Sequence, residues 1–372
     1  MEFGGNRAYN ECIHKEVCRM MENRLARVRA IMAAQGLDQL LITRPQSIFY
    51  LTGQWVEPFD RLDALVVTQD SCRMLCYVLA VIRPEDCEVS VYSDTGETIP
   101  RLSELMDAGT TGVDGFLQSR FLLPLMQLRP DLKLRVSQCV DEARMIKDEA
   151  EIALLRRASE VTDSVFADAF SQLREGMTEL ELGAVFSDSF MRHGVGRFAG
   201  DPMVCFGAGS SEPHHAPGNT PLRPGDTVCV DTGKRIGGYY SDMTRTVFFR
   251  SCSDEQRRVY QTVLEANQAA LDMICPGVLL SDIHQSACRV IEAAGYGEYY
   301  PHRTSHGVGI DFHEEPFDVT GRPLPVAEGM CFSVEPGIYL PGRFGVRIED
   351  LVVVTRDGYS LLNHAPKNLT II

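Results

Sequence analysis

The sequence predicts two domains: an α/β layer over about the first 140 residues, followed by a larger domain of helices and β-hairpins. Up to that point, short β-rich runs alternate with helical stretches. From Lys147 onward, a charged segment carries apolar residues at helical spacing. A chain of 372 residues also exceeds the roughly 250–300 residues at which single hydrophobic cores stop growing. We therefore expect domains at 1–140 and 141–372.

The first domain is predicted to begin with a helix over 24–35, because apolar residues recur there at helical spacing up to Gly36. The first 20 residues show no clear pattern. Short β-rich runs separated by turn residues predict strands at 39–43, 48–51, 64–68, 74–79 and 87–92. Helical stretches at 100–106 and 118–128 interleave with them. This alternation favours an α/β layer.

The second domain is predicted to begin with a long amphipathic helix after Lys147. Thr178 is the expected N-cap of a helix over 179–192, since its hydroxyl can accept a hydrogen bond from the first turn. Beyond this helix the sequence has the pattern of β-hairpins. Two further helices, at 254–274 and 281–294, interrupt them and end close to glycines.

The composition excludes several classes of protein. The chain has 36 Lys and Arg against 51 Asp and Glu, a net charge of −15 that would repel a polyanion, so we expect no nucleic-acid partner. The 12 cysteines include no Cys-x-x-Cys pair and are expected to be free, mostly buried thiols. No apolar stretch has the length of a membrane helix or a signal segment. We therefore expect a cytoplasmic protein without a membrane partner.

Asp231 and Asp242 lie on either side of a predicted β-hairpin. Asp231 falls near the end of a β-rich run, and Asp242 precedes another. Glycines between the two runs, among them Gly237 and Gly238, favour a turn, so we expect the aspartates to be cross-strand neighbours. Like charges opposite each other destabilise a sheet unless something neutralises them. A metal ion would do so.

A second acidic pair follows near the end of the chain. The runs before Pro336 and after Arg343 are predicted to form a hairpin that brings Glu335 across from Glu349. Between the two hairpins, a glycine-rich segment supplies His306. Two divalent cations would neutralise the four carboxylates, and oxygen ligands with a single imidazole suit Mn, Co, Fe or Zn. Solvated sheet faces with salt bridges are the alternative interpretation.

These segments resemble the pita-bread metallopeptidases of family M24, and among them the branch of Xaa-Pro dipeptidases (prolidases) and aminopeptidase P. The resemblance covers nearly the whole chain and rests on the motifs Val-Asp-Thr-Gly, Ser-Asp-Met-Thr-Arg-Thr, His-Gly-Val-Gly, Ser-Val-Glu-Pro-Gly and Arg-Ile-Glu-Asp. It implies an N-terminal creatinase-like α/β domain and a C-terminal α+β pita-bread domain with a curved antiparallel sheet. Ser305 departs from the pattern, because the family commonly has glycine before its ligand histidine.

The resemblance also implies a role for each candidate residue. Two divalent metal ions, manganese first among them, would be held by Asp231, Asp242, His306, Glu335 and Glu349. A hydroxide between the ions would attack the scissile carbonyl, and Glu335 would carry a proton to the departing amine. His214 and His313 map onto imidazoles that orient the substrate and stabilise the oxyanion. Arg347, on the same strand face as Glu349, is expected to bind a substrate carboxylate.

Other polar residues near these motifs are expected to support the site or the fold. His215 follows His214 directly and cannot share its direction in an extended chain, so it is predicted to be supporting or structural. His302 is expected to be structural, and Arg245 is expected to clamp the acidic cluster.

The predicted function is that of a metal-dependent exopeptidase that hydrolyses Xaa-Pro bonds in small peptides, with dipeptides favoured, and that forms a homodimer. Two other enzymes fit the same residues: an aminopeptidase P acting on longer Xaa-Pro peptides, and a hydrolase or lyase acting on a small non-peptide molecule. A peptide-binding protein on the same fold is the non-enzyme alternative. Loss of metal ligands would mark such a protein, and no ligand is lost here.

Overall fold

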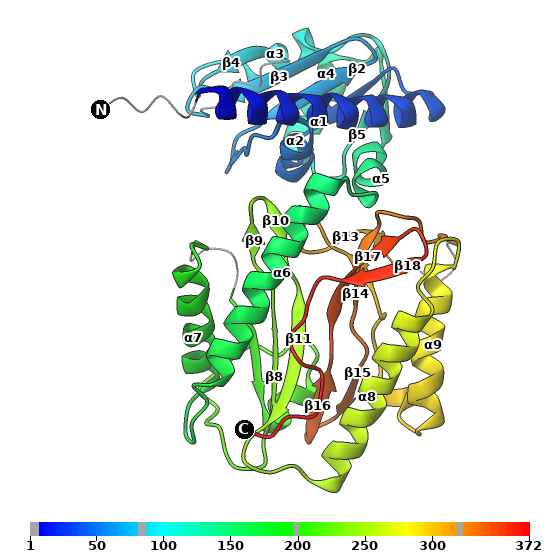
Figure 1. Ribbon diagram of the computed structural model, residues 1–372. Coiled ribbons are helices and arrows are strands. Elements are labelled where there is room, and N and C mark those ends of the chain that lie inside the picture. Colours follow the sequence, from blue (N-terminus) through cyan, green and yellow to red (C-terminus); the bar gives the residue numbers. More distant parts are fainter. Residues whose placement is uncertain (1–6, 81–86, 197–200, 318–322) are drawn as a thin grey trace. The chain divides into compact units, whose positions relative to one another are not determined.

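The computed structural model describes residues 7–80, 87–196, 201–317 and 323–372, with side chains described from residue 21 onward (Figure 1). The chain divides into two compact units, Met1–Arg144 and Met145–Ile372. Within the described ranges, no helix is long and apolar enough to cross a membrane.

The N-terminal unit is built on one mixed sheet, with strand order β4-β3-β2-β1-β5-β6. Its strands are β1 (Gln39–Ile42), β2 (Ala64–Thr68), β3 (Cys72–Tyr77), β4 (Glu88–Tyr92), β5 (Gly109–Val113) and β6 (Leu132–Val136). Its helices are α1 (Arg7–Ala34), α2 (Pro45–Thr52), α3 (Thr98–Glu104), α4 (Ser119–Leu128) and α5 (Cys139–Met145). Leucines of α3 and α4 pack with apolar residues of the sheet in one core. This arrangement confirms the predicted α/β layer.

Two predicted elements of this unit differ in the structure, and strands β5 and β6 and helix α5 were not predicted. Residues 48–51, predicted as a strand, belong to α2, which begins at Pro45 and is capped by Gly53 in the left-handed conformation, at φ 66°. A short buried apolar run cannot by itself distinguish a strand from a helix. The first helix begins at Arg7 rather than at 24, in a stretch without a clear apolar pattern.

Cys72 and Cys87 form a disulfide, whereas the sequence analysis expected free thiols. Cys72 is the first residue of β3, and Cys87 directly precedes β4. These strands are parallel neighbours, and the register pairs Arg73 with Glu88, so the two cysteines lie side by side. The pairing of the strands creates this proximity, and cysteine spacing alone does not reveal it.

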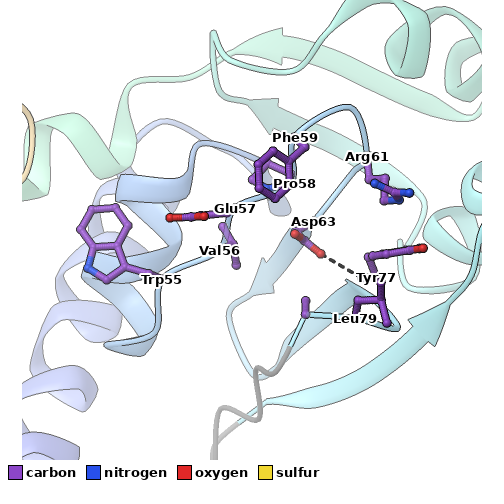
Figure 2. Close-up of a pocket in the computed structure, with 10 residues that line it drawn as sticks. Trp55, Val56, Glu57, Pro58, Phe59, Arg61, Asp63, Tyr77 and Leu79 are labelled. Carbon is purple, nitrogen blue, oxygen red and sulfur yellow. Dashed lines mark hydrogen bonds between the residues drawn. The ribbon is translucent and has the colours of Figure 1, made fainter. Parts of the chain in front are cut away.

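A pocket of about 440 Å³ lies within the N-terminal unit (Figure 2). Its apolar lining includes Trp55, Phe59 and Leu79. The carboxylate of Asp63 accepts a hydrogen bond from the backbone N–H of Tyr77 at 2.9 Å, and burial raises the pKa of Asp63. The described residues of its lining include no histidine, and we assign it no metal site.

The C-terminal unit places antiparallel strands between two pairs of helices (Figure 1). One pair is α6 (Glu149–Phe170) and α7 (Glu179–Arg192), and the other is α8 (Asp254–Asp272) and α9 (Leu280–Ala293). Capping boxes at Asp148, Thr178 and Ser253 begin α6, α7 and α8, so the N-cap predicted at Thr178 is confirmed. The strands and short 3-10 helices are β7 (Met203–Phe206), η1 (Gly207–Ser211), β8 (Thr227–Thr232), β9 (Arg235–Ile236), β10 (Tyr239–Tyr240), β11 (Met243–Phe248), η2 (Gly297–Tyr299), β12 (His306–Gly307), β13 (Glu314–Phe317), β14 (Cys331–Val334), β15 (Gly337–Leu340), β16 (Phe344–Arg347), β17 (Asp350–Thr355) and β18 (Gly358–Leu361).

Two apolar cores hold these layers together. Helices α6 and α7 pack on the three-stranded sheet β11-β8-β7 through phenylalanines such as Phe166 and Phe186. Helices α8 and α9 pack on strands β14 to β17 through aliphatic residues such as Val263 and Ile283. The strands between the two cores carry the acidic residues singled out in the sequence.

Candidate metal centre

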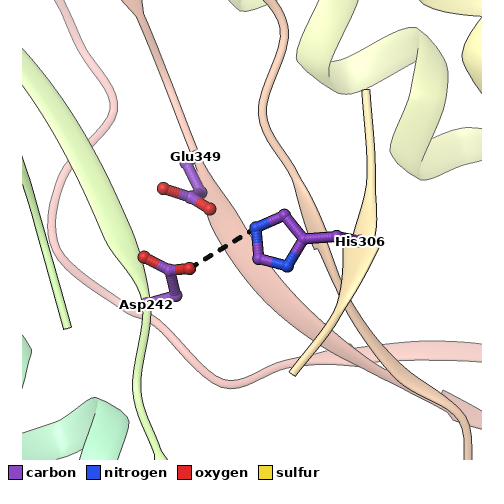
Figure 3. Close-up of side chains that lie close together, drawn as sticks. All are labelled: Asp242, His306 and Glu349. Carbon is purple, nitrogen blue, oxygen red and sulfur yellow. Dashed lines mark ion pairs between the residues drawn. The ribbon is translucent and has the colours of Figure 1, made fainter. Parts of the chain in front are cut away.

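Three ligand-type side chains from distant parts of the sequence meet in the C-terminal unit (Figure 3). One ligand atom from each of Asp242, His306 and Glu349 lies within 4.8 Å of the other two, and all three residues are buried. The Nε2 atom of His306 lies 3.6 Å from Asp242 Oδ2 and 3.3 Å from Glu335 Oε1. Asp231 and Glu335 line the same pocket, whose volume is about 460 Å³. The structure thus brings all five predicted metal ligands together.

The register of β8 and β11 places the two aspartates on one face of the sheet. Asp231, in β8, pairs with Thr244 of β11, and Asp242 directly precedes β11. The expectation that Asp231 and Asp242 are directly opposed is therefore corrected to a diagonal relationship. Diagonal cross-strand neighbours still share a face, so both carboxylates can reach the same pocket. The hairpin β9–β10 continues the same register, with Tyr239 paired to Ile236 across the turn at Gly237 and Gly238.

Glu335 and Glu349 lie at a break between two paired segments. The pairing of β14 with β17 matches Val334 with Asp350, and the pairing of β15 with β16 matches Gly337 with Arg347. The register is the same on both sides of the break, so Glu335 lies across from Glu349, as expected from the hairpin pattern in the sequence. Strand β12, which begins with His306, pairs with β14 through Gly307 and Phe332 and brings the imidazole beside this break.

Burial and mutual repulsion act strongly on these carboxyl groups. Burial, reinforced by the charge of Glu349, raises the pKa of Asp242 well above its ordinary value. Burial and the charge of Glu335 do the same to Glu349. Burial raises the pKa of Glu335 to about 8, against the opposing effect of Arg347. Burial also lowers the pKa of His306 to about 3, so its imidazole is neutral.

These residues fit a divalent metal ion. The buried Oδ1 atoms of Asp231 and Asp242 have no hydrogen-bond partner among the described residues. Buried carboxylate oxygens without partners are costly in a protein interior, and a cation would satisfy them. A neutral imidazole such as that of His306 has a lone pair to donate, and hard carboxylate oxygens with one imidazole suit first-row divalent ions.

Arg347 is engaged by the protein. Its Nη2 atom donates to Asp231 Oδ2 at 2.8 Å, its Nη1 atom to the hydroxyl of Tyr339 at 2.8 Å, and its Nε atom to Thr244 Oγ1 at 3.1 Å. Nη1 also lies 3.5 Å from the carbonyl oxygen of Pro213. The guanidinium is nearly fully buried and links Asp231 to Tyr339 and Thr244. It therefore fixes the position of Asp231.

The other histidines surround the same pocket. The ring centroid of His313 lies 4.0 Å from that of His306, and His214 and His302 line the pocket with it. His302, which was expected to be structural, bonds through Nε2 to the hydroxyl of Tyr339 at 2.8 Å. His214 makes no hydrogen bond to any residue that the structure describes.

Two hydroxyl groups that the sequence analysis did not single out hold the ligands in place. Thr244 Oγ1 donates to Glu349 Oε2 at 2.7 Å. Ser333 Oγ accepts from the backbone N–H of His306 at 3.1 Å and donates to Glu335 Oε1 at 3.2 Å. Each hydroxyl lies two residues along the chain from a ligand, Asp242 or Glu335. Alternate residues of a strand point to the same face, so this spacing could have identified Thr244 and Ser333 from the sequence.

Arg245 and Ser305 are buried and do not line the pocket. The guanidinium of Arg245 donates to Asp350 Oδ1 at 2.7 Å and also to the carbonyl oxygen of Glu349, so it holds the strand that follows this ligand. This geometry agrees with the predicted clamp. Ser305 is buried, and its hydroxyl has no hydrogen-bond partner in the described part of the chain.

Known proteins resemble this chain over almost its full length. A family model described as metallopeptidase family M24 matches residues 153–356, and one described as the creatinase/prolidase N-terminal domain matches residues 24–146. The Xaa-Pro dipeptidase of Lactobacillus delbrueckii subsp. lactis is 32% identical, over 91% of this chain and 95% of its own length.

Solved structures show the same fold. The dipeptidase PepE from Mycobacterium ulcerans superposes with a TM-score of 0.88 at 33% identity, covering 95% of this chain and 98% of its own. The prolidase from Thermococcus sibiricus superposes with a TM-score of 0.88 at 30% identity, covering 95% and 99%. These matches confirm the predicted creatinase-type N-terminal domain and pita-bread C-terminal domain, and they support a peptidase. The chain belongs to metallopeptidase family M24.

Proposed function

We propose that the protein hydrolyses the bond that precedes proline in Xaa-Pro dipeptides, with two divalent metal ions held by the five ligand residues. The observation that carries this proposal is the convergence of four carboxylates and one neutral imidazole on a single pocket of about 460 Å³. Pockets of this size hold small ligands. Relatives named Xaa-Pro dipeptidase and prolidase support the substrate class.

The metal ions would supply two things when bound: a nucleophile derived from water near neutral pH, and polarisation of the scissile carbonyl. Asp231, Asp242, His306 and Glu349 hold the ions. Glu335 is proposed to hold an ion as well and to move a proton from the attacking water to the departing amine. Its side chain is 16% exposed, whereas that of Asp242 is 2% exposed, so Glu335 has access to the pocket.

His214 and His313 are proposed to orient the substrate and to donate hydrogen bonds to the oxygen that becomes negative as the carbonyl is attacked. Both line the pocket. Burial lowers the pKa of His313, which favours a neutral imidazole that can act as a hydrogen-bond donor. The role of Arg347 in binding a substrate carboxylate stays a prediction, and its bonds to Asp231 and Tyr339 support a positioning role.

Three finer points belong to the same proposal. Manganese is the expected metal because the ligand set is rich in hard oxygen atoms, with cobalt, iron or zinc as substitutes. A homodimer is expected from the family resemblance, and the cytoplasmic location stays a prediction.

A panel of peptides tests the proposed substrate class. Purified enzyme with added Mn²⁺ is incubated with Ala-Pro, Leu-Pro, Leu-Ala and Leu-Pro-Gly, and the released amino acids are separated and quantified. We expect free proline from both Xaa-Pro dipeptides and little cleavage of the other two peptides. Cleavage of Leu-Pro-Gly alone would identify an aminopeptidase P instead. Intact peptides throughout, with metal bound, would move the function to a non-peptide substrate.

A further inference from the structure

The segment 207–218 brings His214 to the pocket, and it is held from two sides. On one side, the hairpin of β15 and β16 contacts it, and the backbone N–H of Gly345 donates to Ser210 Oγ at 2.8 Å. On the other side lies Glu179, the first residue of α7. Neither Glu179 nor His215 lines the pocket of the metal site.

The carboxylate of Glu179 accepts hydrogen bonds from the backbone at both ends of this segment. Its side chain is fully buried. The Oε1 atom accepts from the backbone N–H of Phe206 at 2.8 Å, just before the segment, and Oε2 accepts from that of Gly218 at 2.9 Å, at its end. Such a carboxylate is tolerated in the interior only when it is hydrogen-bonded, and here it is bonded to the chain that it organises.

His215 ties the middle of the segment to the same carboxylate. Its Nε2 atom lies 3.0 Å from both oxygens of Glu179. The segment packs closely on this pair, since a Cβ atom added at Gly209 would lie 3.0 Å from His215 Cε1 and 3.2 Å from Glu179 Oε1. The adjacent His214 has no such anchor, as it makes no hydrogen bond to a described residue and lines the pocket.

We propose that the buried Glu179–His215 pair is a positioning device that fixes the direction of His214 in the pocket. The inference rests on the proposed function of His214. An imidazole that must meet a developing charge loses its effect when it is misplaced, and no hydrogen bond from His214 to a described residue prevents this. Among the described residues, no hydrogen bond joins a metal ligand to the pair, so losing the pair lowers turnover while the metal stays bound.

Two substitutions of His215 separate this role from simple support of the fold. His215→Leu removes the donor to Glu179 at similar volume, and His215→Gln keeps an N–H of similar reach. We expect His215→Leu to lower kcat for Leu-Pro by about ten- to hundred-fold, and His215→Gln to recover most of the loss. The matched control is Glu212→Gln, because the exposed Glu212 carboxylate lies 3.6 Å from the other ring nitrogen of His215. This control is expected to keep wild-type kcat.

A double-mutant cycle with His214→Ala provides the decisive readout. If His215 acts through His214, then His215→Leu adds no further loss to the His214→Ala enzyme. Metal content per chain should be equal in all variants, and amide hydrogen exchange at Gly218 should be faster in Glu179→Gln than in the wild type.

Losses that multiply in the double variant would overturn the inference, as would full activity of His215→Leu or of His214→Ala, or unchanged exchange at Gly218 in Glu179→Gln. A wild-type enzyme that cleaves no Xaa-Pro peptide would instead refute the proposed function. In that case faster exchange at Gly218 in Glu179→Gln would still support the anchoring of the segment, because it requires no turnover.

Discussion

Replacing Arg245 by methionine is expected to destabilise the C-terminal domain strongly. The Arg245 side chain is 4% exposed and bonds Asp350 Oδ1 at 2.7 Å, the carbonyl oxygen of Ala365 at 2.9 Å and that of Glu349. Removing one partner of a buried ion pair costs about 3–5 kcal/mol, and we take the lower end because Lys367 Nζ still pairs with Asp350 Oδ2 at 2.7 Å. For a domain of this size, each kcal/mol lowers Tm by roughly 2–4 °C, so we expect a fall of about 10 °C.

The assay is differential scanning calorimetry of chelator-treated protein, which keeps differences in metal affinity out of the comparison. Arg245→Lys is expected to recover part of the loss, because lysine keeps the charge but not the planar fork of donors. Arg157→Met is the matched control, since the pair of Arg157 with Glu160 is 3.6 Å long and exposed and is worth less than about 1 kcal/mol. A Tm of Arg245→Met within about 2 °C of the Arg157→Met value would refute the clamp.

Four further predictions test the site and the fold. Asp242→Ala should lose bound metal and activity while the N-terminal domain still unfolds at its wild-type temperature in calorimetry; a fully active variant would contradict the ligand assignment. Burial raises the pKa of Glu335 to about 8, and the pKa values of Asp242 and Glu349 are also raised, so metal binding must displace protons. Titration calorimetry in two buffers should therefore show proton release on metal binding, and a metal affinity that is weaker at pH 6 than at pH 8. The metal-free protein should likewise lose stability as pH rises from about 6.5 to 8, because the folded state holds protons that the unfolded state has released, and flat stability over that window would oppose this. Cys72 and Cys87 should resist alkylation in denaturant until a reductant is added, as read by peptide mass spectrometry.

The sequence predicted much of the fold because its patterns are local. The apolar periodicity of α6 to α9 and the N-cap at Thr178 depend on neighbouring residues, and these features are found in the structure. The strand predicted at residues 48–51 was wrong because so short a run has no periodicity. The helix found there begins at Pro45 and is capped by Gly53. The disulfide of Cys72 depends on which strands are neighbours, which no local pattern encodes.

The candidate site shows the same division. Acidic residues near strand ends indicated which side chains would converge, and the structure brings them to one pocket. The diagonal offset of Asp231 and Asp242 follows from the two-residue turn at Gly237 and Gly238, because counting outward from this turn pairs Asp231 with Thr244. The partners of Arg347 and Glu179 lie far away in the sequence, so their hydrogen bonds appear only in three dimensions.

The most direct test of the central claim is to measure metal content and peptide cleavage on the same sample. Metal is quantified by mass spectrometry after purification, after chelation, and after restoration with Mn²⁺ or Co²⁺, and proline release from Leu-Pro is followed at each stage. We predict about two ions per chain, loss of proline release on chelation, and its return with the metal. Undiminished proline release from fully demetallated protein would contradict the account.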